Sequence, residues 1–200
     1  MSQPRIIAGR AKGLRLLPVP GETTRPITDR VKEALFNIIN QDIIDARLLD
    51  LFGGTGSVGI EALSRGAGFV QFVELHSQVV KVLRENLQRS KLDSSAHIQT
   101  GDSFAFLKKY NAEPFDYIFI APPQYRDMWR EALDIIDSKP QLVVDDGWII
   151  VQIHPIEYKN TSLTSLTEFD QRKYGSTLLV FYEKKLLDQS NSTLNDPSSV

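Results

Sequence analysis

The sequence predicts an α/β fold, in which a central, mostly parallel sheet carries helices on both faces. Short apolar segments alternate with segments of helical periodicity from residue 47 onward, and this alternation is typical of parallel sheets covered on both sides. A glycine-rich turn joins the first of these strands to a helix, and an acidic residue ends the second strand. The chain has 200 residues, a usual length for one domain of this kind.

The start of the chain predicts a small appendage beside the main sheet. Residues 5–8 and 14–17 are apolar enough for two short strands, and Gly9 and Gly13 between them favour a hairpin. Three prolines and a glycine follow within residues 18–26, which indicates a linker or loop.

These features divide the chain into three parts. Residues 1–26 form the expected basic hairpin and linker, and residues 27–184 form the expected main domain. Residues 185–200 are rich in Ser, Asn and Asp and hold few apolar side chains. Because such a segment buries too little surface to fold, we expect a disordered tail there.

A helix is expected to open the main domain. Thr28 or Asp29 can accept a hydrogen bond from the first helical turn as its N-cap. Apolar residues between Val31 and Ile39 fall at helical spacing, which gives this helix one apolar face down to about residue 40.

The remaining elements alternate along the chain. Each expected strand is a short apolar segment, and most are followed by an expected helix with an apolar face. The expected strands cover residues 48–52, 69–74, 97–100, 115–120, 148–153 and 177–182. The expected helices cover about residues 57–65, 77–91, 103–109 and 126–137.

The composition excludes several functional classes. The chain has no cysteine, so it has no disulfide framework, thiolate metal site or cysteine nucleophile. No apolar segment approaches the length of a signal-peptide core or a membrane span. His76, His97 and His154 lack the spacing of metal ligands, so we expect no metal site. Together these features predict a cytoplasmic protein.

Positive charge is concentrated at the start of the chain. The first 32 residues carry a net charge of +5, whereas the rest of the chain carries −7. A basic arm on an acidic body favours contact with a polyanion, although a solvated basic face without a partner explains the charge equally well. Arg25, Arg30 and Lys32 lie at or near the N-terminal end of the expected first helix, where cations oppose the helix dipole. Their position favours a binding role.

A glycine motif marks the strongest candidate site. Gly54, Gly56 and Gly59 follow the first strand of the main sheet and open the next helix. Glu74 lies twenty positions after Gly54, at the end of the second strand. Such glycines let the backbone approach a ligand, and the carboxylate can accept bonds from both hydroxyls of a ribose. The alternative is a tight turn followed by an ordinary surface glutamate.

Three features favour S-adenosylmethionine over a nicotinamide dinucleotide as the ligand. Asp50 precedes the glycines, where a carboxylate can bind the amino group of a methionine but disfavours a pyrophosphate. Asp102 follows the third strand, where it can meet an adenine amino group, cap the next helix, or do both. A Pro-Pro turn ends the fourth strand. The expected cofactor-binding residues are Asp50, Phe52, Gly53, Gly54, Thr55, Gly56, Glu74, Asp102 and Ser103.

Five segments carry the pattern of a known family, at residues 5–9, 24–37, 49–56, 61–67 and 115–120. Over about residues 4–183 the chain resembles the RsmD family of 16S ribosomal RNA guanine-N2 methyltransferases. The Arg-Pro-x-x-Asp-Arg-Val part of the second segment is specific to this family, whereas the glycine motif is shared with many methyltransferases. The resemblance implies a Rossmann-like class I methyltransferase sheet of seven strands, of which only the last is antiparallel. It also implies methyl transfer from S-adenosylmethionine to N2 of a guanine.

One departure from the family pattern falls after the fourth strand. The family carries Asp-Pro-Pro-Tyr there, whereas this chain carries Ala-Pro-Pro-Gln-Tyr. In the family pattern the acidic residue accepts a hydrogen bond from the exocyclic amino group, and the aromatic residue stacks on the flipped base. Here backbone carbonyls or the Gln124 amide can still accept, and Tyr125 can stack if the loop is shifted by one. The residues implied at the reacting base are Ala121, Pro122, Pro123, Gln124 and Tyr125.

The resemblance implies ribosomal RNA, or a small ribosomal subunit particle, as the partner of a protein that we expect to be a monomer. Two other functions remain open. One is an RNA-binding or ribosome-assembly protein that has lost turnover through Ala121. The other is an NAD-dependent oxidoreductase, which Asp50 and the Pro-Pro turn disfavour. The residues implied at the RNA are Arg5, Arg10, Lys12, Arg25, Arg30 and Lys32.

Overall fold

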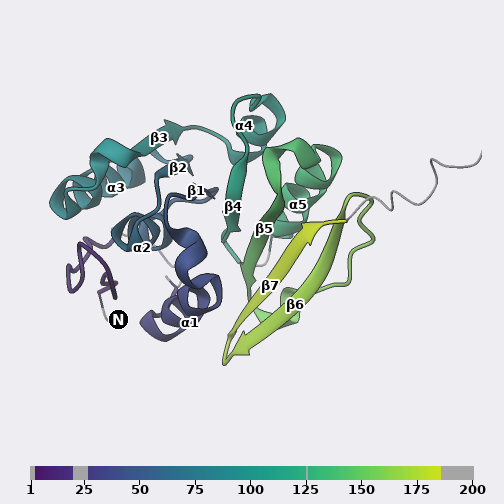
Figure 1. The fold of residues 1–200 in the computed structure, drawn as a ribbon, viewed down its shortest axis with the longest axis horizontal. Helices are drawn as coiled ribbons and strands as arrows, with labels where there is room; N and C mark the ends of the chain where they lie inside the picture. The colour runs from purple at the N-terminus through teal and green to yellow at the C-terminus, as the bar shows by residue number, and fades with distance from the viewer. Residues whose placement is uncertain (1–2, 20–26, 125, 186–200) are drawn as a thin grey trace, which may run out of the picture.

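One seven-stranded sheet forms the centre of the protein, as the computed structural model shows for residues 3–19, 27–124 and 126–185 (Figure 1). The strand order is β3-β2-β1-β4-β5-β7-β6. β7 runs antiparallel to both of its neighbours, and the other pairs are parallel. This confirms the expected sheet of seven strands with only the last one antiparallel. The strands are β1 (Arg47–Asp50), β2 (Phe69–Glu74), β3 (Ala96–Thr100), β4 (Phe115–Ile120), β5 (Val143–Ile153), β6 (Leu166–Tyr174) and β7 (Thr177–Lys184).

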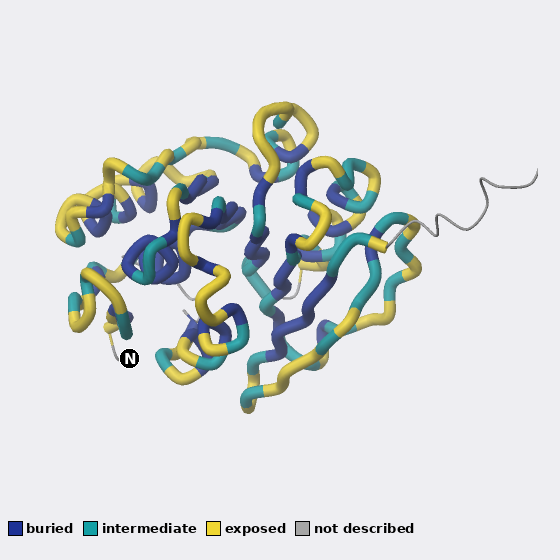
Figure 2. Tube along the Cα trace, viewed as in Figure 1, coloured by how far each residue is buried: buried dark blue, intermediate teal, exposed yellow. Residues whose placement is uncertain are grey.

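Helices cover both faces of the sheet (Figure 1), and each face has its own apolar core. Figure 2 shows that the central strands are mostly buried. One core joins α1, α2 and α3 to side chains such as Leu48 and Phe119. The other joins α4 and α5 to the alternate side chains of the same strands, such as Leu49 and Ile118. Burial on both faces explains why the central strands read as continuous apolar segments. The helices are α1 (Asp29–Ile39), α2 (Ser57–Arg65), α3 (Ser77–Ser90), α4 (Ser103–Lys109) and α5 (Met128–Ser138).

The first helix begins where the sequence predicts. The Thr28 hydroxyl accepts a hydrogen bond from the Val31 N–H at 3.4 Å, which makes Thr28 the N-cap. The helix ends before Asn40, whose φ of 53° leaves the helical region. Short 3-10 helices lie at η1 (Asn40–Ile43), η2 (Asp93–Ser95), η3 (Pro140–Leu142) and η4 (Pro155–Glu157).

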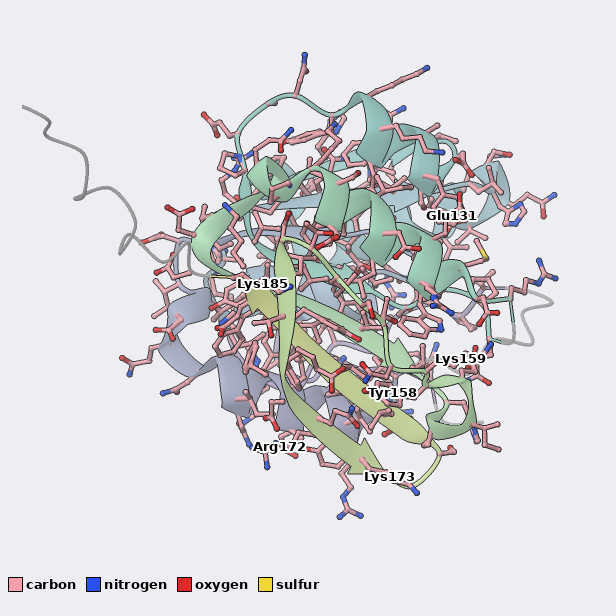
Figure 3. The ribbon with its side chains drawn as sticks, turned by 90° about the vertical axis from the view of Figure 1, so that its right-hand side faces the viewer. Glu131, Tyr158, Lys159, Arg172, Lys173 and Lys185 are labelled. Carbon is pink, nitrogen blue, oxygen red and sulfur yellow. The ribbon has the colours of Figure 1, made fainter. Side chains whose placement is uncertain are left out.

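Two strands differ from the sequence-based expectation. β6 was not among the expected strands, because it lies at the edge of the sheet and is mostly polar. Figure 3 shows the charged side chains of Arg172 and Lys173 along it. β5 begins at Val143, earlier than the expected residue 148, and its register against β4 shifts near the exposed pair Asp145 and Asp146. These two acidic residues interrupt the apolar pattern, so the sequence did not indicate the first half of the strand.

The N-terminal arm, residues 3–19, packs against α1, α2 and α3. The expected hairpin is reduced to one antiparallel bridge between Arg5 and Arg15. Ile6 and Leu16 flank this bridge and are fully buried in the core that α1 shares. Asn86 of α3 accepts a hydrogen bond from the Leu17 N–H at 2.7 Å, which fixes the far end of the arm.

Some expectations concern residues that the structure does not describe. The greater part of the expected linker, residues 20–26, and nearly all of the expected tail, residues 186–200, lie outside the described residues, as do Arg25 and Tyr125. Among the helices of the described parts, none has both the length and the apolar character that crossing a membrane requires.

Candidate functional site

A cleft of about 1090 Å³ opens at the carboxyl ends of β1, β2 and β4. The strand order reverses beside β1, because β2 lies on one side of it and β4 on the other. Ligands of open α/β sheets bind at such a point. The described residues that line the cleft include the expected Asp50, Phe52, Gly53, Gly54, Thr55, Glu74, Asp102, Ser103, Ala121, Pro122, Pro123 and Gln124.

The glycine turn has the backbone that the motif predicts. Gly56 has a φ of 79°, in the left-handed region that favours glycine, and directly precedes α2. Gly59 lies within the helix, where an added Cβ would come within 2.3 Å of the Phe72 ring. The third glycine of the motif therefore lets the helix pack closely on the sheet. Gly56 shapes the turn but is not among the residues that line the cleft.

Glu74 is held at the cleft by two backbone groups. One carboxylate oxygen accepts from the Gly54 N–H at 3.1 Å, and the other accepts from the His76 N–H at 2.9 Å. Each carboxylate oxygen has more than one lone pair, so both oxygens can accept a further bond. Two adjacent hydroxyl groups, such as those of a ribose, match this arrangement.

Asp50 is a buried carboxylate at the base of the cleft. Its side chain accepts a hydrogen bond from the Gly59 N–H at 3.2 Å. Burial raises its pKa to about 7, and the nearby Glu74 charge acts in the same direction. In the described part of the chain no ion pair with Lys, Arg or His involves this carboxylate. A cationic group of a ligand would therefore meet a charge that the protein leaves uncompensated.

Asp102 and Ser103 connect the cleft to α4. Asp102 is the N-cap of this helix, because its carboxylate accepts from the Ala105 N–H at 2.7 Å. The side chain is exposed and lines the cleft, so its second oxygen is available to a ligand. Ser103 is buried, and its hydroxyl donates to the Leu51 carbonyl at 2.6 Å. That bond ties α4 to the end of β1.

The Pro-Pro corner forms the other wall of the cleft. Ala121, Pro122, Pro123 and Gln124 are half-buried and follow β4 directly. Ala121 presents a methyl group and packs against the core that contains Phe119. The corner as described thus offers backbone carbonyls and the Gln124 amide as acceptors.

Several residues that line the cleft were not named in the sequence analysis, among them the polar residues Gln152 and Arg126. Gln152 lies near the carboxyl end of β5, the strand beside β4. Because the carboxyl ends of parallel strands meet at one edge, a polar residue at the end of the fifth strand was a usable signal. Arg126 follows the corner and is exposed. Its proximity to the corner was the only sequence signal for it.

Most of the expected RNA-binding residues in the described segments are exposed. Arg10, Lys12 and Arg30 are exposed residues, and the Arg10 guanidinium also donates to the Leu63 carbonyl at 3.1 Å. Arg5 is also exposed and forms an ion pair of 2.6 Å with Asp29 of α1. The arm continues toward the cleft, because Val19 belongs to its lining.

The assignment of Lys32 to the RNA surface was wrong. Its side chain is fully buried, and its ammonium group donates to the Arg5 carbonyl at 2.7 Å and to the Ser57 hydroxyl at 3.0 Å. It also lies 3.5 Å from the buried carboxylate of Glu61. Burial lowers its pKa, whereas the Glu61 charge opposes that shift. Lys32 therefore joins α1, α2 and the N-terminal arm, and a phosphate cannot reach it.

The fold and the cleft together define the class I methyltransferase architecture. The solved structure of the Escherichia coli protein YhhF shares it with a TM-score of 0.80 and 30% sequence identity, covering 92% of this chain and 99% of that one.

Residues 4–183 match the family model described as Conserved hypothetical protein 95, and the chain belongs to this family. YlbH of Bacillus subtilis is 34% identical over 186 residues, which are 90% of this chain and 99% of YlbH. Ribosomal RNA small subunit methyltransferase D of Haemophilus influenzae is 41% identical over 134 residues, which are 66% of this chain and 69% of the relative. These matches confirm the resemblance to the RsmD family.

Proposed function

We propose that the protein is an S-adenosylmethionine-dependent methyltransferase that acts on the exocyclic N2 of a guanine in 16S ribosomal RNA. The buried Asp50 carboxylate carries this proposal, because it lines the cleft at the switch point and forms no ion pair with any residue that the structure describes. The name of the Haemophilus influenzae relative supports ribosomal RNA of the small subunit as the substrate.

The chemistry of the cleft fits the methyl donor. Asp50 would bind the ammonium group of the methionine part, and the burial that raises its pKa would be offset by that cation. Glu74 would accept from the two ribose hydroxyls, and Asp102 would accept from the adenine amino group. A pyrophosphate in the same place would meet the Asp50 charge, so the cleft disfavours a nicotinamide dinucleotide.

The protein's own contribution to the reaction is positioning. When bound, S-adenosylmethionine supplies an activated methyl group: the amine lone pair forms the new N–C bond, the S–C bond breaks with its electrons left on sulfur, and the surplus amine proton passes to water. Holding both reactants in line supplies several kcal/mol of the barrier. Among the described groups beside the Pro-Pro corner, the Ala121 and Pro122 carbonyls or the Gln124 amide can accept from the amino group and so direct its lone pair.

The substrate would reach the cleft as a base turned out of its stack, because the N2 lone pair of a paired guanine lies above and below the ring plane, where stacked neighbours cover it. The exposed cations Arg5, Arg10, Lys12 and Arg30 would hold phosphates of the flanking RNA. Such contacts are independent of sequence and weaken with salt. They position the RNA, while the corner selects the base.

A catalytically impaired RNA-binding protein is the second candidate, and the methyl side chain of Ala121 favours it. Nucleoside mass spectrometry of 16S ribosomal RNA from a strain without the protein separates the two. The proposal predicts the loss of one N2-methylguanosine, restored by the wild-type chain and not by Asp50→Asn. An unchanged modification profile, with S-adenosylhomocysteine still bound by the purified protein, would favour the impaired form. Titration with NADH in parallel tests the oxidoreductase alternative.

A further inference from the structure

Gln152 lies beside Ala121 at the edge of the sheet that borders the cleft. The last paired residues of β4 and β5 are Ile120 and Val151, so Ala121 and Gln152 occupy the next position on two strands that lie about 4.8 Å apart. Ile120 and Val151 belong to the core under α4 and α5. Since successive side chains alternate between faces, Ala121 and Gln152 both point to the opposite face.

The neighbours of Gln152 confirm this orientation. Ile150, two positions earlier on β5, lies in the core that α1 shares, and so does Leu179, which pairs with Gln152 from β7. Ala121 packs against the same core. The Gln152 side chain therefore lies on the same face as these apolar side chains, and it lines the cleft.

The amide oxygen of Gln152 is buried and accepts no hydrogen bond from any described residue. Buried polar atoms are almost always paired, so this acceptor is available to a donor that enters the cleft with a ligand or with water. Two other buried polar atoms of the described chain lack a partner, in Trp129 and Tyr182. Both belong to the core on the other face and neither lines the cleft. Gln152 alone of the three can meet a ligand there.

We propose that the Gln152 Oε1 atom accepts a hydrogen bond from the exocyclic amino group of the target base. The inference rests on the proposed function and names the group that recognises the amine. Ala121 leaves the space for it, because its methyl side chain ends at Cβ, whereas the glutamine extends two carbons further before its amide oxygen.

An acceptor in this place has a defined chemical task. The lone pair of an amine on a guanine ring is conjugated with the ring and is a poor nucleophile. A hydrogen bond from the amine to Gln152 favours the pyramidal nitrogen that forms as the N–C bond develops, and so it acts most strongly in the transition state. The amine proton released after transfer passes to water, so the neutral amide remains unchanged through the reaction.

Methionine is the matched replacement, because Gln152→Met keeps the length of the side chain and removes the acceptor. We expect Gln152→Met to lower kcat by about 10²-fold, the usual effect of losing one such hydrogen bond. The KM for RNA and the affinity for S-adenosylhomocysteine should stay within about twofold of the wild type. The melting temperature should not fall, because methionine replaces an unpaired buried polar group with an apolar one beside apolar side chains.

Two further variants separate an acceptor from a structural residue. Gln152→Glu keeps an acceptor oxygen whether its carboxyl group is protonated or ionised, so it should retain most of kcat. Gln141→Met makes the same exchange at an exposed glutamine in η3 outside the cleft lining, and its kcat should match the wild type.

The outcomes distinguish this inference from the proposed function. Wild-type methylation of guanine N2 together with a slow Gln152→Met and an active Gln152→Glu supports the inference. Wild-type kcat in Gln152→Met, or equal losses in both variants, would overturn it and leave the proposed function standing. A wild-type protein that binds S-adenosylhomocysteine but methylates no RNA would overturn both.

Discussion

Replacing Asp50 with asparagine should stabilise the unliganded protein at neutral pH while it removes ligand binding. Burial raises the Asp50 pKa from 3.8 to about 7, and each unit corresponds to about 1.4 kcal/mol. The folded carboxylate therefore costs roughly 4 kcal/mol once it is ionised. Asparagine has a similar shape and can still accept from the Gly59 N–H, but it carries no charge. The cost of burying the charge is then absent.

The sign of the pH dependence follows from the raised pKa. Between pH 4 and pH 7 the folded state binds the Asp50 proton more tightly than the unfolded state, so this group's stabilising contribution is lost as the pH rises through 7. The difference in unfolding free energy between Asp50→Asn and the wild type should be small near pH 4. It should grow to roughly 4 kcal/mol above pH 7 in favour of asparagine.

Urea unfolding of both proteins without ligand, followed by circular dichroism at several pH values, measures this difference. Other titrating groups are the same in the two proteins, so they cancel when the curves are subtracted. A difference that is constant with pH, or a less stable asparagine variant at pH 8, would refute the assignment of a strained buried carboxylate. Either result would also weaken the argument that a cationic group of the ligand offsets the cost of burying the Asp50 charge.

Three further predictions concern the affinity for the ligand, RNA binding by the N-terminal arm, and the stability that the buried Lys32 contributes. The affinity of the wild type for S-adenosylhomocysteine should rise with pH, by up to about tenfold per unit below pH 7, and level off above it, as calorimetry can measure. Arg5→Ala with Arg30→Ala should weaken RNA binding and reduce its salt dependence by about one unit of slope per lost contact, whereas Arg172→Ala on the edge strand should change neither. Lys32→Met should lower the unfolding free energy by about 3–5 kcal/mol, because it leaves the Glu61 carboxylate buried with less compensation.

Each of these has an outcome that contradicts it. A pH-independent affinity would mean that the ligand does not bind to the ionised Asp50. Equal losses in Arg5→Ala, Arg30→Ala and the control Arg172→Ala would make the effect one of net charge rather than of the arm. If Lys32→Met is as stable as the wild type but binds RNA more weakly, Lys32 contacts RNA, and the structural role that its burial indicates is wrong.

The placement of Asp50, the glycine turn and Glu74 at one cleft could be predicted from the sequence, because these residues are close together in the chain. Asp50 and the glycine turn are consecutive, and Glu74 follows at the distance that one strand–helix–strand unit imposes. The hydrogen bond from Gly54 to Glu74 joins two positions that the motif already relates. Local spacing was enough because the turn and the strand end determine where these groups lie.

The misassigned and missed residues depend on contacts that spacing does not encode. Lys32 counts as one more positive charge in the sequence, and only the packing of α1 on α2 shows that it is buried against Glu61. Gln152 reaches the cleft through the register of β5 against β4. β6 has an exposed outer side and polar side chains, so neither apolar alternation nor length identified it.

A crystal structure with S-adenosylhomocysteine tests the central claim most directly. The account predicts the amino nitrogen of the ligand against Asp50, its ribose hydroxyls on Glu74 and its adenine amino group beside Asp102. A ligand that binds elsewhere, or a cleft that stays empty at saturating concentration, would contradict the account.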